Sequence, residues 1–238
     1  ALTWLPTVPI LYSSRSRASM RIFVVGGKAR KVGKTSVMTA LIRGLPSLDW
    51  TAVKVSRHKT HVPHMHDAAA RRGSSRLGFI LTEERHASTT TDTGRFLAAG
   101  ARRSLWLRVR AGSLNKAVQA LLRAVEGERN VMIESSSVAE HLGPTVCLFV
   151  LDNSRRSFKA DARRSLAQAD AIVQVEAGAE HPSLPSSIPP GVPVFSVQGS
   201  HFVNPGLCRF VRQKLQSASH FRPKSSPPSR RAGIAERS

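Results

Sequence analysis

A strand, a basic loop and a helix in immediate succession constrain the fold of this chain more than any other feature. The apolar run Ile22–Val25 ends in two glycines, a loop rich in lysine and arginine follows, and Gly-Lys-Thr-Ser at 33–36 opens a stretch with helical apolar spacing. Backbone N–H groups in such a loop point inward around an anion, and the positive end of the helix dipole faces it. The order of the three parts predicts a phosphate-binding P-loop.

Each residue type in this loop has an expected task. Gly33 lets the backbone approach a phosphate closely, Lys34 reaches the β- and γ-phosphates, and the Thr35 hydroxyl binds Mg²⁺. The remaining residues that we assign to nucleotide binding in this stretch are Gly27, Lys28, Lys31 and Ser36.

The loop departs from the usual spacing by one residue. Five residues separate Gly27 from Gly33, where the common pattern has four, and Lys28 stands where the first glycine belongs. Either the loop is one residue longer than usual, or Lys28 tolerates the turn.

Three acidic residues are candidates for binding Mg²⁺ or orienting its bound water. Glu134 ends the apolar strand predicted at 130–133, where an acid beside the P-loop strand would hold Mg²⁺ or its bound water. Asp152 ends another apolar strand and is a weaker alternative. Asp92 precedes a helical segment, so it either caps that helix or orients a water or Mg²⁺ at the γ-phosphate. Together with Lys34, we predict Asp92 and Glu134 as catalytic.

Basic residues gather around the end of the second predicted strand, 52–56. In a doubly wound sheet the loops after the carboxyl ends of the strands surround the ligand, so we predict that Lys54 and His58 contact the nucleotide. A second interpretation is a metal site, because the histidine spacing permits one. Its members would be His58, His61, His64 and His66, with Asp67.

Continuously apolar strands that alternate with helices predict an α/β fold of the P-loop NTPase type. We expect a mostly parallel sheet of about seven strands with helices on both faces. The long segment 57–92 is expected to be irregular, and in a compact domain such a segment is usually functional.

The domain is predicted to span residues 20–216. Residues 1–19 contain prolines and a Ser/Arg run, and Met20 directly precedes the first strand, so 1–19 is predicted to be an irregular extension. Residues 217–238 are rich in Ser, Pro and Arg and are predicted to form a disordered basic tail.

Composition narrows the class of protein. Two cysteines in 238 residues argue against a disulfide framework and fit a reducing cytoplasm. No apolar run is long enough to cross a bilayer, so no membrane partner is expected. The net charge of +21 invites a nucleic-acid interpretation, but aromatic residues make up 5% and are not interleaved with the basic runs. A polyanionic ligand explains the basic loop equally well, and nucleic acid is not the favoured partner.

Beyond the P-loop, the order of segments resembles a known family. A Val-Lys-Val strand with trailing histidines is followed by Thr-Asp-Thr-Gly-Arg-Phe-Leu-Ala-Ala-Gly-Ala at 91–101 and by a strand that ends in Glu134. Residues 20–150 thereby resemble the molybdopterin-guanine dinucleotide biosynthesis protein B group, in the signal-recognition/MinD/BioD-like class of P-loop NTPases. By this resemblance, Lys54 and His58 match the Lys-His pair of the second strand, and Asp92 and Arg95 match an Asp…Arg segment.

The resemblance implies GTP binding and action beside a partner enzyme that builds the guanine dinucleotide cofactor. Two features depart from the family pattern: the P-loop has an extra residue, and Ser135 stands where the family has glycine. These departures are compatible with a different function.

Three functions therefore stay open. The favoured one is a GTP- or ATP-binding, Mg²⁺-dependent weak NTPase in molybdenum-cofactor assembly. The second is a small-molecule kinase or ligase of the same fold, and the third is a basic nucleic-acid-binding protein. A homodimer also remains open, and no motif selects guanine or adenine.

Overall fold

The computed structural model describes residues 2–4, 20–58, 78–152, 160–176, 188–198 and 204–217. Predictions for His61, His64, His66 and Asp67, and for the tail from residue 218 on, fall outside these ranges.

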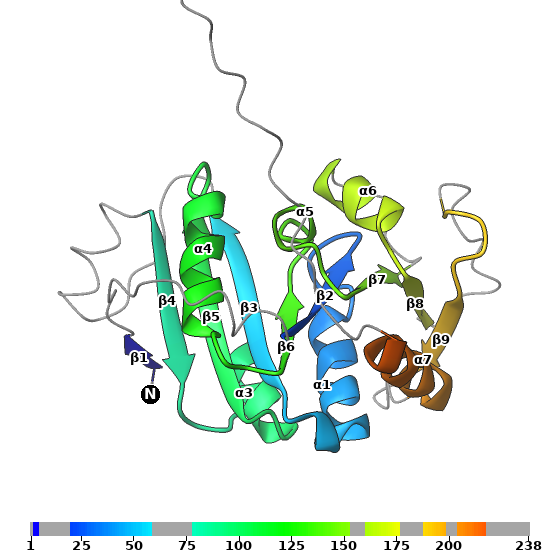
Figure 1. Cartoon of the computed structure of the whole chain (residues 1–238), viewed down its shortest axis with the longest axis horizontal. Coiled ribbons are helices and arrows are strands. Elements are labelled where there is room, and N and C mark those ends of the chain that lie inside the picture. The colour runs from blue at the N-terminus through cyan, green and yellow to red at the C-terminus, as the bar shows by residue number, and fades with distance from the viewer. Residues whose placement is uncertain are drawn as a thin grey trace, which may run out of the picture.

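Nine strands form one sheet through the middle of the molecule (Figure 1). Their order across the sheet is β1-β4-β5-β3-β6-β2-β7-β8-β9. All neighbouring strands run parallel, except that β4 is antiparallel to both β1 and β5. The bounds are β1 Leu2–Trp4, β2 Arg21–Gly27, β3 Thr51–His58, β4 Phe79–Glu84, β5 Arg103–Arg110, β6 Asn130–Glu134, β7 Val146–Asp152, β8 Ala171–Glu176 and β9 Val194–Gln198.

Helices cover both faces of this sheet, as the buried clusters show. Side chains of α1, α3 and α7 pack against one face, and those of α4, α5 and α6 pack against the other. The bounds are α1 Lys34–Gly44, α3 Asp92–Ala98, α4 Leu114–Ala124, α5 Ala139–Leu142, α6 Ala160–Ala167 and α7 Pro205–Ser217, with a short 3₁₀ turn at Pro46–Leu48. The predicted α/β fold, with a mostly parallel sheet between two helical layers, is confirmed.

The central strand β2 explains why the phosphate-binding loop sits where it does. Its alternate residues enter opposite cores: Phe23 and Val25 face α1, whereas Ile22 and Val24 face α4 and α5. A strand buried on both faces reads as a continuous apolar run, because neither face meets water. Parallel neighbours β6 and β7 flank β2, so the ends of three buried strands meet beside the loop.

Two predicted irregular segments contain strands. β4 lies within 57–92, and β1 lies within 1–19 and pairs with β4 at the sheet edge. β4 ends in two acids, a poor strand signal, but both acids have partners in the fold. Glu83 accepts two hydrogen bonds from Arg103, at 3.1 and 3.0 Å. Glu84 accepts hydrogen bonds from the Arg85 N–H and from the Thr93 hydroxyl of α3. Tertiary pairing therefore outweighs local propensity at this edge.

Candidate functional site

The loop after β2 begins one residue later than the sequence suggests. The Lys28 backbone N–H donates to the Val150 carbonyl at 3.2 Å, so Lys28 continues the pairing of β2 with β7. Among the described residues other than glycine, only Lys31 and Asp49 have positive φ, and Lys31 has φ 59°. The left-handed positions of the loop are thus Lys31 and Gly33, and Lys28 needs no glycine-like turn. Its side chain is buried, whereas Lys31 is exposed.

Gly27 allows the loop to fold over the end of β2. A Cβ at this position would lie 3.0 Å from Val32 Cγ2 and 3.1 Å from the Lys34 side chain. On the other side, the Gly27 N–H donates to Ser136 Oγ at 3.2 Å, and the Ser136 hydroxyl donates to the Gly27 carbonyl at 3.0 Å. Ser136 thus binds both backbone polar groups of Gly27, a role that the sequence does not signal.

The helix that follows the loop presents its N-terminus without a side-chain cap. Gly33 is the N-cap, with φ 90°, and no acidic residue occupies the first turn of α1. The first N–H groups of a helix lack intrahelical partners and carry the positive end of its dipole, which favours a bound anion. Lys34 folds back over the loop, where its Nζ donates to the Ala29 carbonyl at 2.6 Å.

Four side chains from four elements meet beside this helix start. The Thr35 hydroxyl of α1 donates to Glu134 Oε2 of β6 at 2.7 Å. The Lys54 ammonium of β3 pairs with Glu134 Oε1 and, at 2.9 Å, with Asp92 Oδ2 of α3. Glu134 is buried, with only 4% of its side chain exposed, and Asp92 is 38% exposed. We call Thr35, Lys54, Asp92 and Glu134 the carboxylate cluster.

The charges within the carboxylate cluster stabilise one another. Burial by itself would lower the pKa of Lys54, but attraction and hydrogen bonding from Glu134, and then from Asp92, outweigh burial and raise it. Burial by itself would raise the pKa of Asp92, but Lys54, a hydrogen bond from Thr35 and the charge of Arg95 outweigh burial and lower it. Both Lys54 and Asp92 are therefore charged at neutral pH.

Asp92 does not cap α3, so the first of the two roles predicted for it is excluded. Thr91 is the N-cap, and its side chain accepts a hydrogen bond from the Gly94 N–H at 3.0 Å. Asp92 is the first helical residue, so its carboxylate is left to face Lys54 and Arg95. Arg95 Nη1 lies 3.8 Å from Asp92, and Arg95 Nη2 donates to Ser36 Oγ at 3.4 Å. Arg95 thereby links α3 to the first turn of α1.

Glu84 positions α3 and is a second residue that sequence reasoning missed. Its carboxylate accepts hydrogen bonds from the Arg85 N–H at 3.1 Å and from the Thr93 hydroxyl at 3.2 Å. It therefore fixes both ends of the turn that delivers Asp92 to the carboxylate cluster. The signal was present, since an acid directly precedes a polar turn at the end of an apolar run.

We expect Gly94→Ala to destabilise the protein by roughly 1–3 kcal/mol, as overpacking usually does. A Cβ at this position would lie 2.7 Å from Ser88 Cβ and 3.0 Å from the Ser88 backbone nitrogen, so the turn before α3 would have to move. Urea unfolding of both proteins measures the loss. Thr91→Ala, which removes the cap and a long hydrogen bond from Thr91 to Glu84 (3.5 Å), should cost about 1 kcal/mol. Wild-type stability of Gly94→Ala would contradict the packing of this turn against the helix.

Two other candidates lie apart from the carboxylate cluster. His58 ends β3 four residues beyond Lys54, roughly 13 Å along a strand. Asp152 ends β7, on the other side of β2 from Glu134. Within the described residues, no group of three or more His, Cys, Asp or Glu side chains is arranged to hold a metal ion. The predicted histidine metal site depends mainly on residues outside those ranges and stays a prediction.

Comparison with solved structures supports the fold. HypB from Helicobacter pylori, in complex with nickel, is similar over 85% of this chain and 90% of its own, with a TM-score of 0.51 and 12% identity. An LAO/AO transport system kinase is similar over 86% of this chain and 63% of its own (TM-score 0.47, 12% identity). A ParA family ATPase from Chlorobium tepidum is similar over 84% and 90% (TM-score 0.41, 12% identity). At 12% identity, the likeness to HypB shows the α/β fold alone.

No protein-family model matches the chain, and no curated protein matches it. The resemblance to the molybdopterin-guanine dinucleotide biosynthesis protein B group stays a prediction. None of the helices in the described ranges is both long and apolar enough to cross a membrane.

Proposed function

We propose that this chain binds a nucleoside triphosphate with Mg²⁺ in the loop between β2 and α1 and uses it in slow hydrolysis or phosphoryl transfer. One observation carries the proposal. The first turn of α1 and the acid at the end of β6 are joined by the Thr35–Glu134 hydrogen bond, at the uncapped helix N-terminus. A phosphate-binding loop needs a hydroxyl and an acid close together at this place for its metal.

The oxygen donors of the carboxylate cluster fit Mg²⁺. Magnesium prefers carboxylate and hydroxyl oxygens and usually takes only one or two carboxylates, with water and phosphate completing its shell. Thr35, Glu134 and Asp92 supply such oxygens, and bound Mg²⁺ would neutralise the charge that develops on the phosphates. The Lys54 ammonium now lies between the two carboxylates, so the metal must compete with it.

The residues of the loop would bind the phosphates and neutralise their charge. Gly33 and Ser36 present backbone N–H groups to the phosphates, and Gly27 lets the loop fold closely over the end of β2. Lys34 leaves the Ala29 carbonyl to neutralise the β- and γ-phosphates, and Lys28 and Lys31 add positive charge. Lys34, Asp92 and Glu134 act where charge develops during transfer. The resemblance noted above favours GTP and a role in guanine dinucleotide cofactor assembly beside a partner enzyme.

Thermal unfolding with ATP or GTP, with and without Mg²⁺, tests this function. At about 100 times the dissociation constant a ligand of the folded state stabilises by ~2.7 kcal/mol. That corresponds to a rise of roughly 5–10 °C in the unfolding midpoint for a domain of this size. We expect the rise with Mg²⁺ and GTP to exceed that with Mg²⁺ and ATP. The absence of any rise with either nucleotide would refute nucleotide binding, and an equal rise would refute the preference for guanine.

A further inference from the structure

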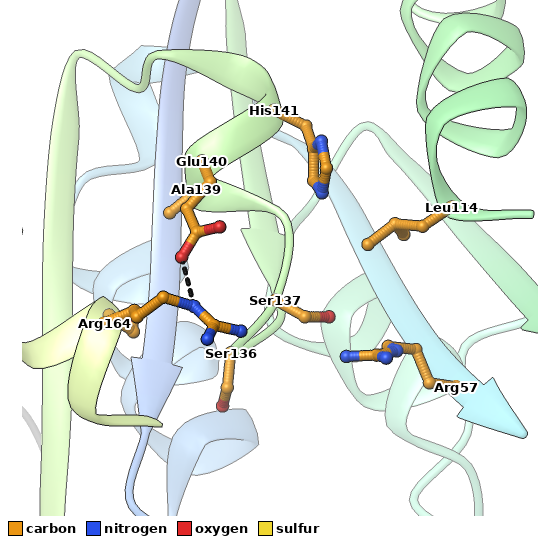
Figure 2. A pocket seen from close by; sticks show the side chains of 9 residues that line it. Arg57, Leu114, Ser136, Ser137, Ala139, Glu140, His141 and Arg164 are labelled. Carbon is orange, nitrogen blue, oxygen red and sulfur yellow. Dashed lines mark ion pairs between the residues drawn. The ribbon is translucent and has the colours of Figure 1, made fainter. Parts of the chain in front are cut away.

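A polar pocket of about 150 Å³ lies at the carboxyl edge of the sheet, on the side of α5 and α6 (Figure 2). It is smaller than the roughly 300–1,000 Å³ of sites that enclose a drug-sized ligand, so it suits one small group and not a whole nucleotide. The residues that line it are Arg57, Leu114, Ser136, Ser137, Ala139, Glu140, His141, Arg164 and Ser165.

The lining is arranged for an anion. Figure 2 shows the guanidinium groups of Arg57 and Arg164 pointing toward one another from opposite sides, with Ser137 between them. Glu140 is the one acid among the lining residues, and it pairs with Arg164 Nε at 2.6 Å. The planar guanidinium forms parallel hydrogen bonds to carboxylate or phosphate oxygens, and serine hydroxyls add neutral donors. Among the described residues that line the pocket, two cations therefore stand against one acid.

The pocket shares a residue with the phosphate-binding loop. Ser136 lines it and also exchanges hydrogen bonds with the Gly27 N–H and carbonyl, at 3.2 and 3.0 Å. Ser136 also stands two residues after Glu134 of the carboxylate cluster. An anion held between the two arginines would therefore lie next to the loop, on the opposite helical layer from α1.

We propose that this pocket binds the doubly charged oxyanion group, phosphate or dicarboxylate, of a second small-molecule ligand while the nucleotide occupies the loop. Arg57 and Arg164 hold the anion, and Ser136 couples its binding to the conformation of the Gly27 peptide. The role of this molecule as a co-substrate rests on the proposed nucleotide function, but the binding itself does not. Such a subsite is what a small-molecule kinase or ligase of this fold requires.

The test uses inorganic phosphate and succinate as probes, each titrated into the full chain saturated with Mg²⁺ and a non-hydrolysable nucleotide. Chemical shifts of the Ser136 and Ser137 amides report binding. Arg164→Gln should weaken binding of the preferred probe about tenfold, because it removes a charge-assisted hydrogen bond. Glu140→Gln breaks the same ion pair but leaves the cation, so it should tighten binding. Arg163→Gln, on the exposed side of α6, is the matched control and should change little.

The possible results separate the two proposals. If neither probe shifts Ser136 or Ser137 in the nucleotide-saturated protein, or if Arg164→Gln and Glu140→Gln change binding in the same direction, the anion subsite is refuted and nucleotide binding stands. A probe that displaces the nucleotide also refutes it, because the anion then belongs to the loop. If the nucleotide does not bind, each probe is titrated into Lys34→Ala without nucleotide, because this variant weakens anion binding at the loop. The same shifts and the same opposite effects of Arg164→Gln and Glu140→Gln then decide whether the subsite exists. Preference for phosphate or succinate identifies the chemistry of the group.

Discussion

Lys34→Ala should abolish measurable nucleotide binding and leave the folded protein intact. The Lys34 ammonium now rests on the Ala29 carbonyl, within the loop and beside the helix N-terminus. Exchanging this contact for triphosphate oxygens costs little, because one hydrogen bond replaces another, and the charge of the ligand strengthens the new bonds. Loss of this cation should weaken binding at least a hundredfold, the equivalent of about 2.7 kcal/mol.

Calorimetric titration of the nucleotide into wild type and Lys34→Ala measures this loss. Arg30→Ala is the matched control, since Arg30 is an exposed cation of the same loop. If the effect were only one of net charge near the ligand, both variants would weaken binding alike. Equal affinity of Lys34→Ala and wild type would show that the loop does not bind phosphate in this way. Urea unfolding checks that the variant is folded, and we expect a change of less than about 0.5 kcal/mol, as for a partly exposed side chain.

The central strands and their helices were predictable from the sequence because one signal dominates each of them. β2, β6 and β7 are buried on both faces and read as continuous apolar runs, and α4 shows apolar residues at helical spacing. The edge of the sheet was not predictable in the same way. β4 contains two acids whose partners, Arg103 and Thr93, lie elsewhere in the chain, and β1 depends on β4 for its pairing.

The candidate site was likewise predictable only where a single sequence signal dominates. The motif located Lys34 and Thr35, and the position of Glu134 at a strand end was enough to place it near them. The role of Asp92 was ambiguous, because an acid before a helix is a good cap and a good ligand alike. Thr91, the residue before it, is the N-cap instead, and no spacing rule predicts which of the two residues caps the helix. Ser136 acts on the backbone of Gly27, which is far away in the chain, so no linear pattern indicates its role. The acid before a polar turn did mark Glu84, but its partner Thr93 lies across that turn and could not be identified from spacing alone.

Lys54→Met should make the stability of this protein depend on Mg²⁺ in the absence of nucleotide. In the wild type the Lys54 ammonium neutralises Glu134 and Asp92, and Mg²⁺ alone should leave the unfolding midpoint unchanged. Methionine keeps most of the packing volume but leaves two carboxylates facing one another. Removal of one partner of a buried pair costs about 3–5 kcal/mol, and the partial exposure of Asp92 reduces this to roughly 1–3 kcal/mol.

Millimolar Mg²⁺ should restore much of the stability that Lys54→Met loses, because the cation takes the place of the ammonium between the same oxygens. Thermal unfolding with Mg²⁺, or with EDTA, measures the effect. The double variant Lys54→Met/Glu134→Gln is the control, since it lacks one of the carboxylates and should respond little to the metal. If Mg²⁺ stabilises the wild type as much as Lys54→Met, the ammonium does not occupy the position of the metal.

The competition between Lys54 and Mg²⁺ also gives the lysine a second task. If Mg²⁺ entered with a nucleotide and were held by Glu134 and Asp92, the ammonium would lose its partners on β6 and α3. The triphosphate is the nearest concentration of negative charge that could replace them, and an ammonium on a flexible stem can turn toward it. Lys54→Met should therefore bind Mg²⁺ alone more tightly than the wild type but bind the Mg²⁺–nucleotide complex more weakly. These opposite changes distinguish exchange between two positions from a lysine that only neutralises the acids, since in the latter case both affinities would rise together.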